Sequence, residues 1–242
     1  MKNMRNNTYI LDFKQGDVNG DGFPEDIYLL GEKTSPDEFF SDNITLLIKV
    51  PKANIYIKVP LHNASGYNAE LYLGHFTDHD KLDMLVSVDT GGSGRYILSY
   101  LYTLKNLKPV LIFDSNVFES NSNYTATFID QFKVIVKSMQ DNTEFTIDVS
   151  NNKEMYLEAG IYESSGKISN PTVGGVLGLG ALWPLQENYN GLSSLLALQR
   201  IIGINNADNL GAVYTYLKWD EKKIVEDRVQ IGIMPSYTSQ SD

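Results

Sequence analysis

Short runs of β-branched and aromatic residues, each broken by Gly, Asn, Asp, Ser or Pro, recur along the whole chain. Such segments favour β-strands joined by tight turns, and helical periodicity is scarce between them. The pattern predicts strands at Tyr9–Phe13, Ile27–Leu30, Ile44–Val50, Ile55–Val59, Leu71–Leu73, Met84–Val88, Tyr96–Leu104, Val110–Phe113, Tyr124–Ile129, Phe132–Lys137, Glu144–Val149, Leu195–Leu198, Ala212–Trp219 and Ile224–Ile231. A helix is predicted at Met155–Tyr162, whereas Leu192–Arg200 fits either a helix or a buried strand. The sequence therefore predicts an all-β protein.

One turn-rich stretch recurs, and an apolar segment follows each copy. Aligning "GDVNGDGFPEDIYLL" with "GHFTDHDKLDMLVSV" and "PLQENYNGLSSLLAL" pairs Asp17 with His75, 58 positions on, and with Gln186, a further 111 positions on. Half of the longer interval falls near Asp130, in another turn between apolar segments. The spacing predicts four blade-like units of roughly 56 residues, about 8–65, 66–120, 121–175 and 176–235, in a β-propeller-like arrangement. An irregular β-sandwich is the alternative.

The charge balance narrows the classes of partner. The chain has 30 Asp plus Glu against 20 Lys plus Arg, a formal net charge of -10, which repels nucleic-acid phosphates and anionic lipid. The lack of Cys removes disulfides, thiolate zinc sites and thiol nucleophiles together. No apolar run approaches the ~18 residues of a membrane span, and the start shows no apolar signal-peptide core. We therefore expect no nucleic-acid partner and no membrane insertion. With no signal peptide visible, the chain is cytosolic, has lost its signal or is exported by another route.

The first copy of the turn carries oxygen-bearing groups at alternate positions. Calcium takes about six to eight hard oxygens, which a tight loop with a central glycine supplies from alternate residues. The candidate ligands are Asp17, Asn19, Asp21, the Phe23 carbonyl, and either Glu25 or Asp26. A solvated Asx-type turn is the alternative, because Asp-Gly and Asn-Gly pairs form turns readily. Because clustered carboxylates repel one another unless a cation compensates them, the sequence predicts one Ca²⁺ in this loop.

This loop resembles the calcium loops of the FG-GAP/VCBS repeat family, whose pattern reads D-x-[DN]-x-D-G-x-x-D between two strands of a propeller blade. The match is specific from Asp17 to Asp26 and loose elsewhere, and Glu25 stands where the family pattern has Asp. The resemblance implies a non-catalytic, calcium-stabilised binding or scaffold module with a protein or glycan ligand. It also implies a place at a bacterial cell surface or envelope.

The other two copies have lost most of the acids. In the second copy His75 and His79 replace the family's acids, Thr77 and Asp83 stay in register, and Asp78 and Asp80 fall out of register. A His pair at this spacing binds zinc when both lie on a helix, but this segment is predicted to be a turn. The third copy keeps a turn-like composition without charge at Gln186, Asn188, Asn190, Gly191 and Ser194. We therefore predict metal-free turns at both places.

Catalytic motifs are weak. Asp89 in "LVSVDTGGSG" looks like an aspartic-protease loop, but that chemistry needs two carboxylates and no second Asp-Thr-Gly or Asp-Ser-Gly occurs. Asp89 is therefore predicted to be structural. Tyr67, Tyr96 and Tyr189 lie in or beside predicted turns, where aromatic faces could bind sugars, although packing is favoured for each. The chain is expected not to be an enzyme; the alternative is a hydrolase with acidic residues on a propeller face, which needs a cleft that brings together two acids from different repeats.

Overall fold

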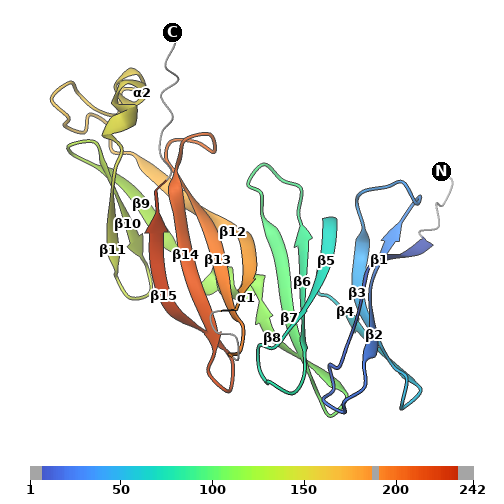
Figure 1. Ribbon diagram of the computed structural model, residues 1–242. Helices are drawn as coiled ribbons and strands as arrows, with labels where there is room; N and C mark the ends of the chain where they lie inside the picture. The colour runs from blue at the N-terminus through green and yellow to red at the C-terminus, as the bar shows by residue number, and fades with distance from the viewer. Residues whose placement is uncertain (1–6, 187–190, 234–242) are drawn as a thin grey trace, which may run out of the picture.

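The computed structural model describes residues 7–186 and 191–233. They form three antiparallel sheets that follow one another along the molecule (Figure 1). The first sheet has the order β1-β2-β3-β4, with bounds Asn7–Gly16, Glu25–Lys33, Asp42–Val50 and Ile55–Pro60. The second sheet has the order β5-β6-β7-β8, with bounds Tyr67–Gly74, Asp83–Asp89, Ile97–Lys105 and Lys108–Asp114.

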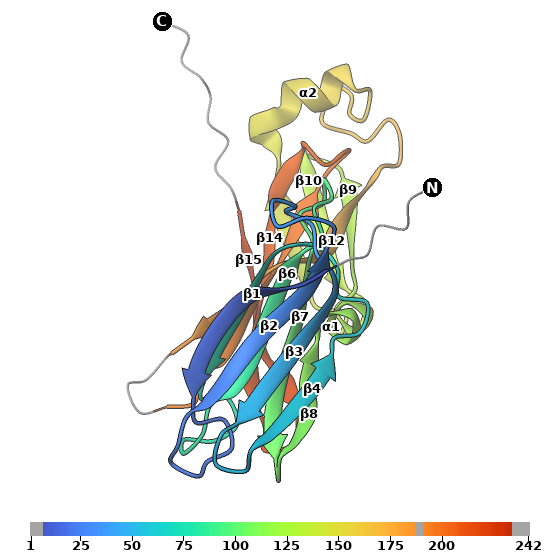
Figure 2. The ribbon, with the colours of Figure 1, turned by 90° about the vertical axis from the view of Figure 1, so that its right-hand side faces the viewer.

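The third sheet has seven strands in the order β11-β10-β9-β12-β13-β14-β15. Their bounds, from β9 to β15, are Tyr124–Ile129, Lys133–Ser138, Glu144–Asp148, Val173–Leu185, Ser194–Ile202, Asn209–Trp219 and Ile224–Gly232. Helix α1 (Ser115–Asn121) follows β8, and α2 (Lys153–Glu158) lies beyond one end of the third sheet (Figure 2). No helix in residues 7–186 and 191–233 is long and apolar enough to cross a membrane.

The all-β prediction is confirmed, and every predicted strand overlaps an observed one. The ambiguous segment Leu192–Arg200 is strand β13, while the predicted helix at Met155–Tyr162 overlaps α2. The sequence did not predict α1 or the long strand β12.

The predicted division into four separate four-stranded units differs from the structure after residue 120. Strands β9 and β12 pair through Val173–Gly175 and Thr125–Thr127, so the predicted units 121–175 and 176–235 share one seven-stranded sheet. The spacing suggested a further copy of the turn near Asp130, but the β9–β10 hairpin closes there between Ile129 and Lys133, a shorter connection than in the three aligned hairpins.

The second sheet buries side chains on both of its faces. Along β6, Met84 and Val86 pack in the cluster shared with the first sheet, whereas Leu85 between them packs in the cluster shared with the third sheet. Strand β7 repeats the alternation, because Tyr100 contacts the first cluster and Leu101 the second. Successive side chains of a strand point to opposite faces, so a strand that is apolar throughout requires a covering layer on each side. The three sheets are therefore held together face to face.

A third hydrophobic cluster joins strands β9–β11, β13 and β14 of the third sheet to the segment around α2. Tyr156 of α2 is fully buried among Phe128, Tyr162 and Val213. Its hydroxyl donates to the carboxylate of Asp208, at 2.9 Å from Oδ1. This bond satisfies the polar end of a buried aromatic side chain and fixes α2 against the sheet.

The three aligned turns join equivalent positions of three hairpins. The last pair of register partners is Gly16 with Glu25 in β1–β2, Gly74 with Asp83 in β5–β6, and Leu185 with Ser194 in β12–β13. Each pair spans the same number of residues. The sequence alignment of Asp17 with His75 and Gln186 therefore matches the position that follows the first strand of each hairpin.

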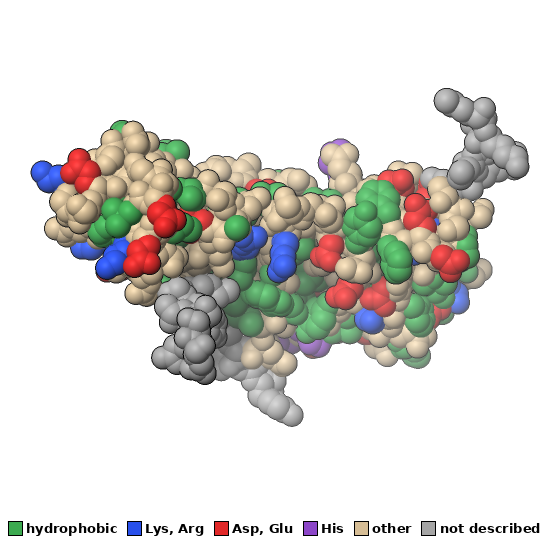
Figure 3. All heavy atoms as spheres, turned by 90° about the horizontal axis from the view of Figure 1, so that it is seen from above, with side chains coloured by type: hydrophobic (Ala, Val, Ile, Leu, Met, Phe, Trp, Pro, Cys, Tyr) green, Lys and Arg blue, Asp and Glu red, His purple; other side chains and the backbone are tan. Residues whose placement is uncertain are grey.

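Both signs of charge are exposed on the face shown in Figure 3, with hydrophobic side chains between them. On that face acidic side chains are most frequent over the end of the molecule that carries the N-terminus. This distribution accords with the formal net charge of -10.

Strand β12 offers a test of the packing. A Cβ at Gly174 would collide with the carbonyl oxygen of Ile202 on β13, whereas a Cβ at the adjacent Gly175 would lie at ordinary contact distance, 3.6 Å from Ile202 Cγ1. We expect Gly174→Ala to lower the free energy of unfolding by about 1–3 kcal/mol, since the strands must move apart. Gly175→Ala is the matched control and should leave it within ~1 kcal/mol of wild type. Urea unfolding measures both; equal effects would contradict the close strand approach.

Candidate functional site

The first loop, Asp17 to Glu25, holds its shape through its own side chains. The carboxylate of Asp17 accepts backbone N–H groups from Gly20–Gly22, with distances of 2.7 Å to Gly20 N and 2.7 Å to Gly22 N. Asn19 Oδ1 accepts from Asp21 N at 2.8 Å, and Asp21 Oδ1 accepts from Phe23 N at 3.0 Å. These are Asx-type turn contacts. The oxygen atoms predicted to bind calcium are thus also the acceptors that fold the loop.

Glu25 is the acid that closes this loop. It is 1% exposed, and its carboxylate accepts from Val18 N at 3.1 Å and from Asn19 Nδ2 at 2.7 Å. Burial raises the pKa of Glu25, and the negative charges of Asp17 and Asp21 raise it further. A hydrogen bond from the Val18 N–H acts in the opposite direction. The loop therefore places a carboxylate where negative charge is already in excess.

Asp26 does not face the loop. Its carboxylate accepts from Gln15 Nε2 at 2.7 Å and pairs with Lys49 Nζ at 3.0 Å. The hydrogen bonds from Gln15 and Lys49 lower the pKa of Asp26. The sequence left open which acid closes the loop; the contacts assign this position to Glu25 and give Asp26 a pairing role across the sheet.

A lysine already lies beside the first loop. Lys52 Nζ is 3.5 Å from Asp21 Oδ2 and 4.4 Å from the centroid of the Phe23 ring. The donor set suits a hard cation, because all its candidate ligands are oxygen atoms. Among the residues that the structure describes, however, no three His, Asp or Glu side chains are gathered as a metal site. The chemistry of the loop fits calcium, whereas its carboxylates are directed at N–H groups and at Lys52.

The second loop has the same closure with a different acid. Asp83 occupies the position of Glu25, is fully buried, and accepts from Phe76 N at 3.1 Å and Thr77 N at 2.7 Å. Lys81 Nζ lies 3.4 Å from its Oδ1. A buried carboxylate that accepts several N–H groups is satisfied without a metal.

The histidines of the second loop do not form a paired site. His75 Nδ1 donates to the carbonyl oxygen of Lys81 at 2.9 Å, which fixes its ring against the backbone, while His79 is exposed. In the third loop Gln186 is exposed and Ser194 begins β13; Asn188 and Asn190 lie outside the described residues.

Backbone hydrogen bonds connect the three loops in series. Leu82 N, in the second loop, donates to Asp17 O in the first at 2.8 Å. Ser193 N, in the third loop, donates to His75 O in the second at 2.6 Å. In the alignment Leu82 corresponds to Ser193, and Asp17 corresponds to His75. The same contact is therefore made twice, and the loops form a stack that continues from one sheet to the next.

Asp89 ends strand β6, away from these loops. Its carboxylate accepts from Asn68 Nδ2 on β5 at 2.9 Å. The observed partner is an amide on the neighbouring strand, and the structural role of Asp89 stays a prediction.

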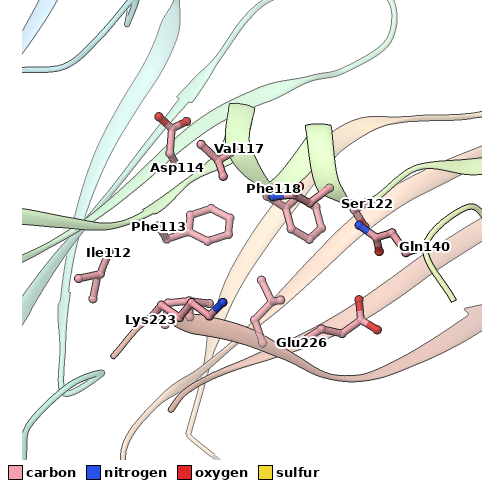
Figure 4. Close-up of a pocket in the computed structure, with 12 residues that line it drawn as sticks. Ile112, Phe113, Asp114, Val117, Phe118, Ser122, Gln140, Lys223 and Glu226 are labelled. Carbon is pink, nitrogen blue, oxygen red and sulfur yellow. The ribbon is translucent and has the colours of Figure 1, made fainter. Parts of the chain in front are cut away.

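A cleft of about 400 Å³, here called the outer cleft, lies where β8 and α1 meet the β14–β15 hairpin (Figure 4). The rings of Phe113 and Phe118 face its interior, and the carboxylate of Asp114 is directed away from Glu226 on the opposite wall. Asp114 Oδ1 accepts from Asn116 N at 2.8 Å and caps α1. Burial raises the pKa of Glu226. This cleft brings together acids from two sheets but separates them by aromatic side chains.

A second cleft, of about 730 Å³ and here called the inner cleft, is bordered by β1, β5 and β12, one strand from each sheet. Its lining residues are Leu11, Asp12, Lys14, Asn68, Ala69, Glu70, Leu71, Tyr72, Leu85, Ser87, Leu182, Trp183 and Pro184. Sequence reasoning missed it. The alignment of the turns was the sequence signal that could have pointed to it. Three of its lining residues are equivalent in that alignment, each two residues before the last paired residue of the first strand: Lys14, Tyr72 and Trp183.

These features define an all-β protein in which stacked antiparallel sheets carry a series of connected hairpin loops and a cleft along their first strands. A model of the YybI C-terminal domain matches residues 122–232. Over 222 residues the chain is 36% identical to the "uncharacterized protein YybI" of Bacillus subtilis (strain 168), covering 92% of this chain and 84% of that protein. The chain belongs to the YybI family. No solved structure matches it.

The family finding overturns the resemblance to FG-GAP/VCBS repeat proteins. That resemblance depended on the stretch from Asp17 to Asp26, whereas the match to YybI covers nearly the whole chain. A short loop built from Asp, Asn and Gly can arise wherever a tight turn must satisfy its own N–H groups, so ten such residues define a turn rather than a family. The place at a bacterial cell surface or envelope that the resemblance implied loses its support with it.

Asp83 provides a test of the loop closure. Asp83→Ala leaves the buried N–H of Phe76 and the partly buried N–H of Thr77 without their acceptor, and a loss of this kind costs about 1–3 kcal/mol for a buried group. Asp80→Ala, in the same loop but exposed, should change the free energy of unfolding by less than ~0.5 kcal/mol. Chemical denaturation distinguishes the two; comparable values would show that the closure is not held by the buried carboxylate.

Proposed function

We propose that this chain is a non-catalytic binding or scaffold module. The observation that carries the proposal is the series of three hairpin loops, closed at the same register and connected by two equivalent backbone hydrogen bonds. Loops supported by a rigid framework serve recognition well, because little order has to be gained on binding. The repeated contact fixes the relative positions of three sheets.

We further propose that β1–β4, β5–β8 and β12–β15 are three blade-like repeats. Each is a run of four antiparallel strands adjacent in sequence, and each begins with one of the three equivalent hairpins. Strands β9–β11 and α2 then extend the last repeat. In this arrangement residues of about 8–65, 66–120 and 176–235 form the repeats, and residues of about 121–175 are an addition to the last one.

We propose that the first loop binds one Ca²⁺ as a structural ion. Its ligands would be Asp17, Asn19, Asp21, the Phe23 carbonyl and Glu25. The supporting observation is the charge balance: Glu25 is buried beside two carboxylates that raise its pKa, and of these three carboxylates Lys52 pairs with that of Asp21 alone. A divalent cation would compensate all three carboxylates, whereas the lysine ammonium reaches one.

Titration calorimetry tests this ion site. Wild-type protein should bind about one Ca²⁺ in the loop, and Asp17→Ala combined with Asp21→Ala should abolish that binding. Lys52→Met should bind more tightly than wild type, because it removes the cation that competes for Asp21. Lys58→Met, an exposed lysine on β4, is the matched control. Calcium binding that persists in the double variant would place the ion elsewhere, and no binding in Lys52→Met would refute the site.

Metal removal supplies an independent test. A ligand that binds only the folded state at a hundredfold excess over Kd stabilises it by about 2.7 kcal/mol. For a chain of this length, EDTA should lower Tm by about 5–11 °C, using ~2–4 °C per kcal/mol. His75→Ala and Gln186→Ala should retain the calcium-dependent part of this shift, since those loops have no comparable charge cluster. A Tm indifferent to EDTA in calcium-loaded protein would contradict a stabilising ion.

The alternative, a hydrolase with paired acids, has less support. In the inner cleft Asp12 accepts from Leu71 N at 2.9 Å and from Lys14 Nζ at 3.0 Å. Burial opposes its ionisation, but these hydrogen bonds outweigh it and lower the pKa of Asp12. An acid of this kind is a poor proton donor at neutral pH. The second acid of the cleft is Glu70, on the neighbouring sheet. It would have to work as a pair with Asp12, whose carboxylate already accepts hydrogen bonds from Leu71 and Lys14.

A further inference from the structure

The inner cleft presents the same position of each repeat to solvent. Lys14, Tyr72 and Trp183 are equivalent in the three hairpins, since their register partners are Ile27, Leu85 and Leu196. The side chain of Lys14 is 45% exposed, and Tyr72 and Trp183 are each 44% exposed. Residues of all three sheets line this cleft, and two of the equivalent residues, Tyr72 and Trp183, are aromatic.

The aromatic ring of Tyr72 is held in place. It packs edge-on to Phe76, with ring centroids 6.3 Å apart and an interplanar angle of 72°. Its Cε1 would lie 2.7 Å from a Cβ on Gly74, so glycine at that position gives the ring its space. A ring fixed before binding loses little conformational freedom when a ligand stacks on it.

Polar groups lie beside the rings. Asn68, Glu70 and Tyr72 are exposed on β5 and line the cleft. Asn68 donates from its amide Nδ2 to the carboxylate of Asp89, and Glu70 has no ion pair among the described residues. The cleft therefore combines aromatic faces with amide, carboxylate and ammonium groups.

We propose that the inner cleft binds a neutral carbohydrate. The C–H face of a sugar ring packs on an aromatic face, whose π-electrons are negative and attract the weakly positive C–H groups. Hydroxyl groups both donate and accept, which suits Glu70 and Asn68 as acceptors and Lys14 as a donor. A volume of about 730 Å³ falls in the range of small-ligand sites. The carboxylates of Asp12 and Glu70, with the net charge of -10, disfavour acidic polysaccharides.

A peptide added as an extra strand is the competing occupant, because β1 and β5 are edge strands of their sheets. The N–H of Leu71 on β5 is already donated to Asp12, so this edge offers an interrupted ladder. Strand addition also leaves the exposed rings of Tyr72 and Trp183 without a role. The carbohydrate proposal uses both. It rests on the proposed function only in treating the chain as a binding module, and it does not depend on calcium.

Trp183 gives a direct readout, since the chain has two tryptophans and Trp219→Phe leaves Trp183 as the remaining one. We expect cello-, xylo-, malto- or chito-oligosaccharides, titrated one series at a time, to produce a saturable change in Trp183 emission. Polygalacturonate should not. By calorimetry, Trp183→Ala and Tyr72→Ala should each weaken the responding sugar at least tenfold, while Tyr56→Ala, an exposed tyrosine on β4, should leave its affinity unchanged.

Three outcomes would overturn the proposal: no binding of any of these four series by folded wild-type protein, undiminished binding in Tyr72→Ala, or capture of peptides from a display library that Tyr72→Ala does not weaken. Circular dichroism and Tm establish that each variant is folded. Release of reducing sugar from a bound oligosaccharide would keep the carbohydrate site but refute the non-catalytic function. If the first loop of the wild-type protein binds no calcium, the ion site is refuted and the carbohydrate site is unaffected.

Discussion

The burial of both faces of the second sheet holds the molecule together. Met84 and Leu85 are neighbours in sequence, yet one packs toward the first sheet and the other toward the third. If either outer sheet were removed, half of the side chains of β6 and β7 would be exposed to water, at about 25 cal/mol for each Å² of apolar surface. A four-stranded sheet with two apolar faces cannot be stable alone, and the three sheets therefore fold as one unit.

This burial also explains why the loop chemistry varies while the loop position does not. Glu25 and Asp83 both accept N–H groups inside their loops, and Ser194 takes the third position without an acid. What all three loops share is backbone: the register at which they close and the hydrogen bond that connects each to the next. Backbone contacts tolerate substitution of side chains. A cation in the first loop would therefore add stability to a stack whose geometry already exists.

The strands were predictable because alternation and turn residues are local signals. Strand β12 was missed because its glycines lower the strand propensity of Val173–Leu185, and the need for glycine arises from distant residues. A Cβ at Gly174 would meet the Ile202 carbonyl, and one at Gly178 would lie 2.7 Å from the Glu119 carboxylate. No pattern within the segment shows either contact.

The site was predictable in part for the same reason. The choice between Glu25 and Asp26 could have been made from strand alternation, since Ile27 and Leu29 share the inward face with Glu25. Of the tyrosines considered for sugar binding, Tyr67 packs against Phe40, neither Tyr67 nor Tyr96 lines the inner cleft, and Tyr189 lies outside the described residues. The cleft itself needed the fold, because Tyr72 and Trp183 belong to different sheets.

The loops and the inner cleft are coupled through the strands they share. Lys14, Tyr72 and Trp183 each lie two residues before a loop closure, so the hydrogen bonds from Leu82 to Asp17 and from Ser193 to His75 fix the spacing of the cleft walls. A side chain at such a position can change without disturbing the backbone stack. The first repeat has lysine there, and the other two have aromatic rings. The fold therefore separates the groups that set the spacing of the cleft from those that give it its chemistry, and this separation lets a constant framework present a variable surface.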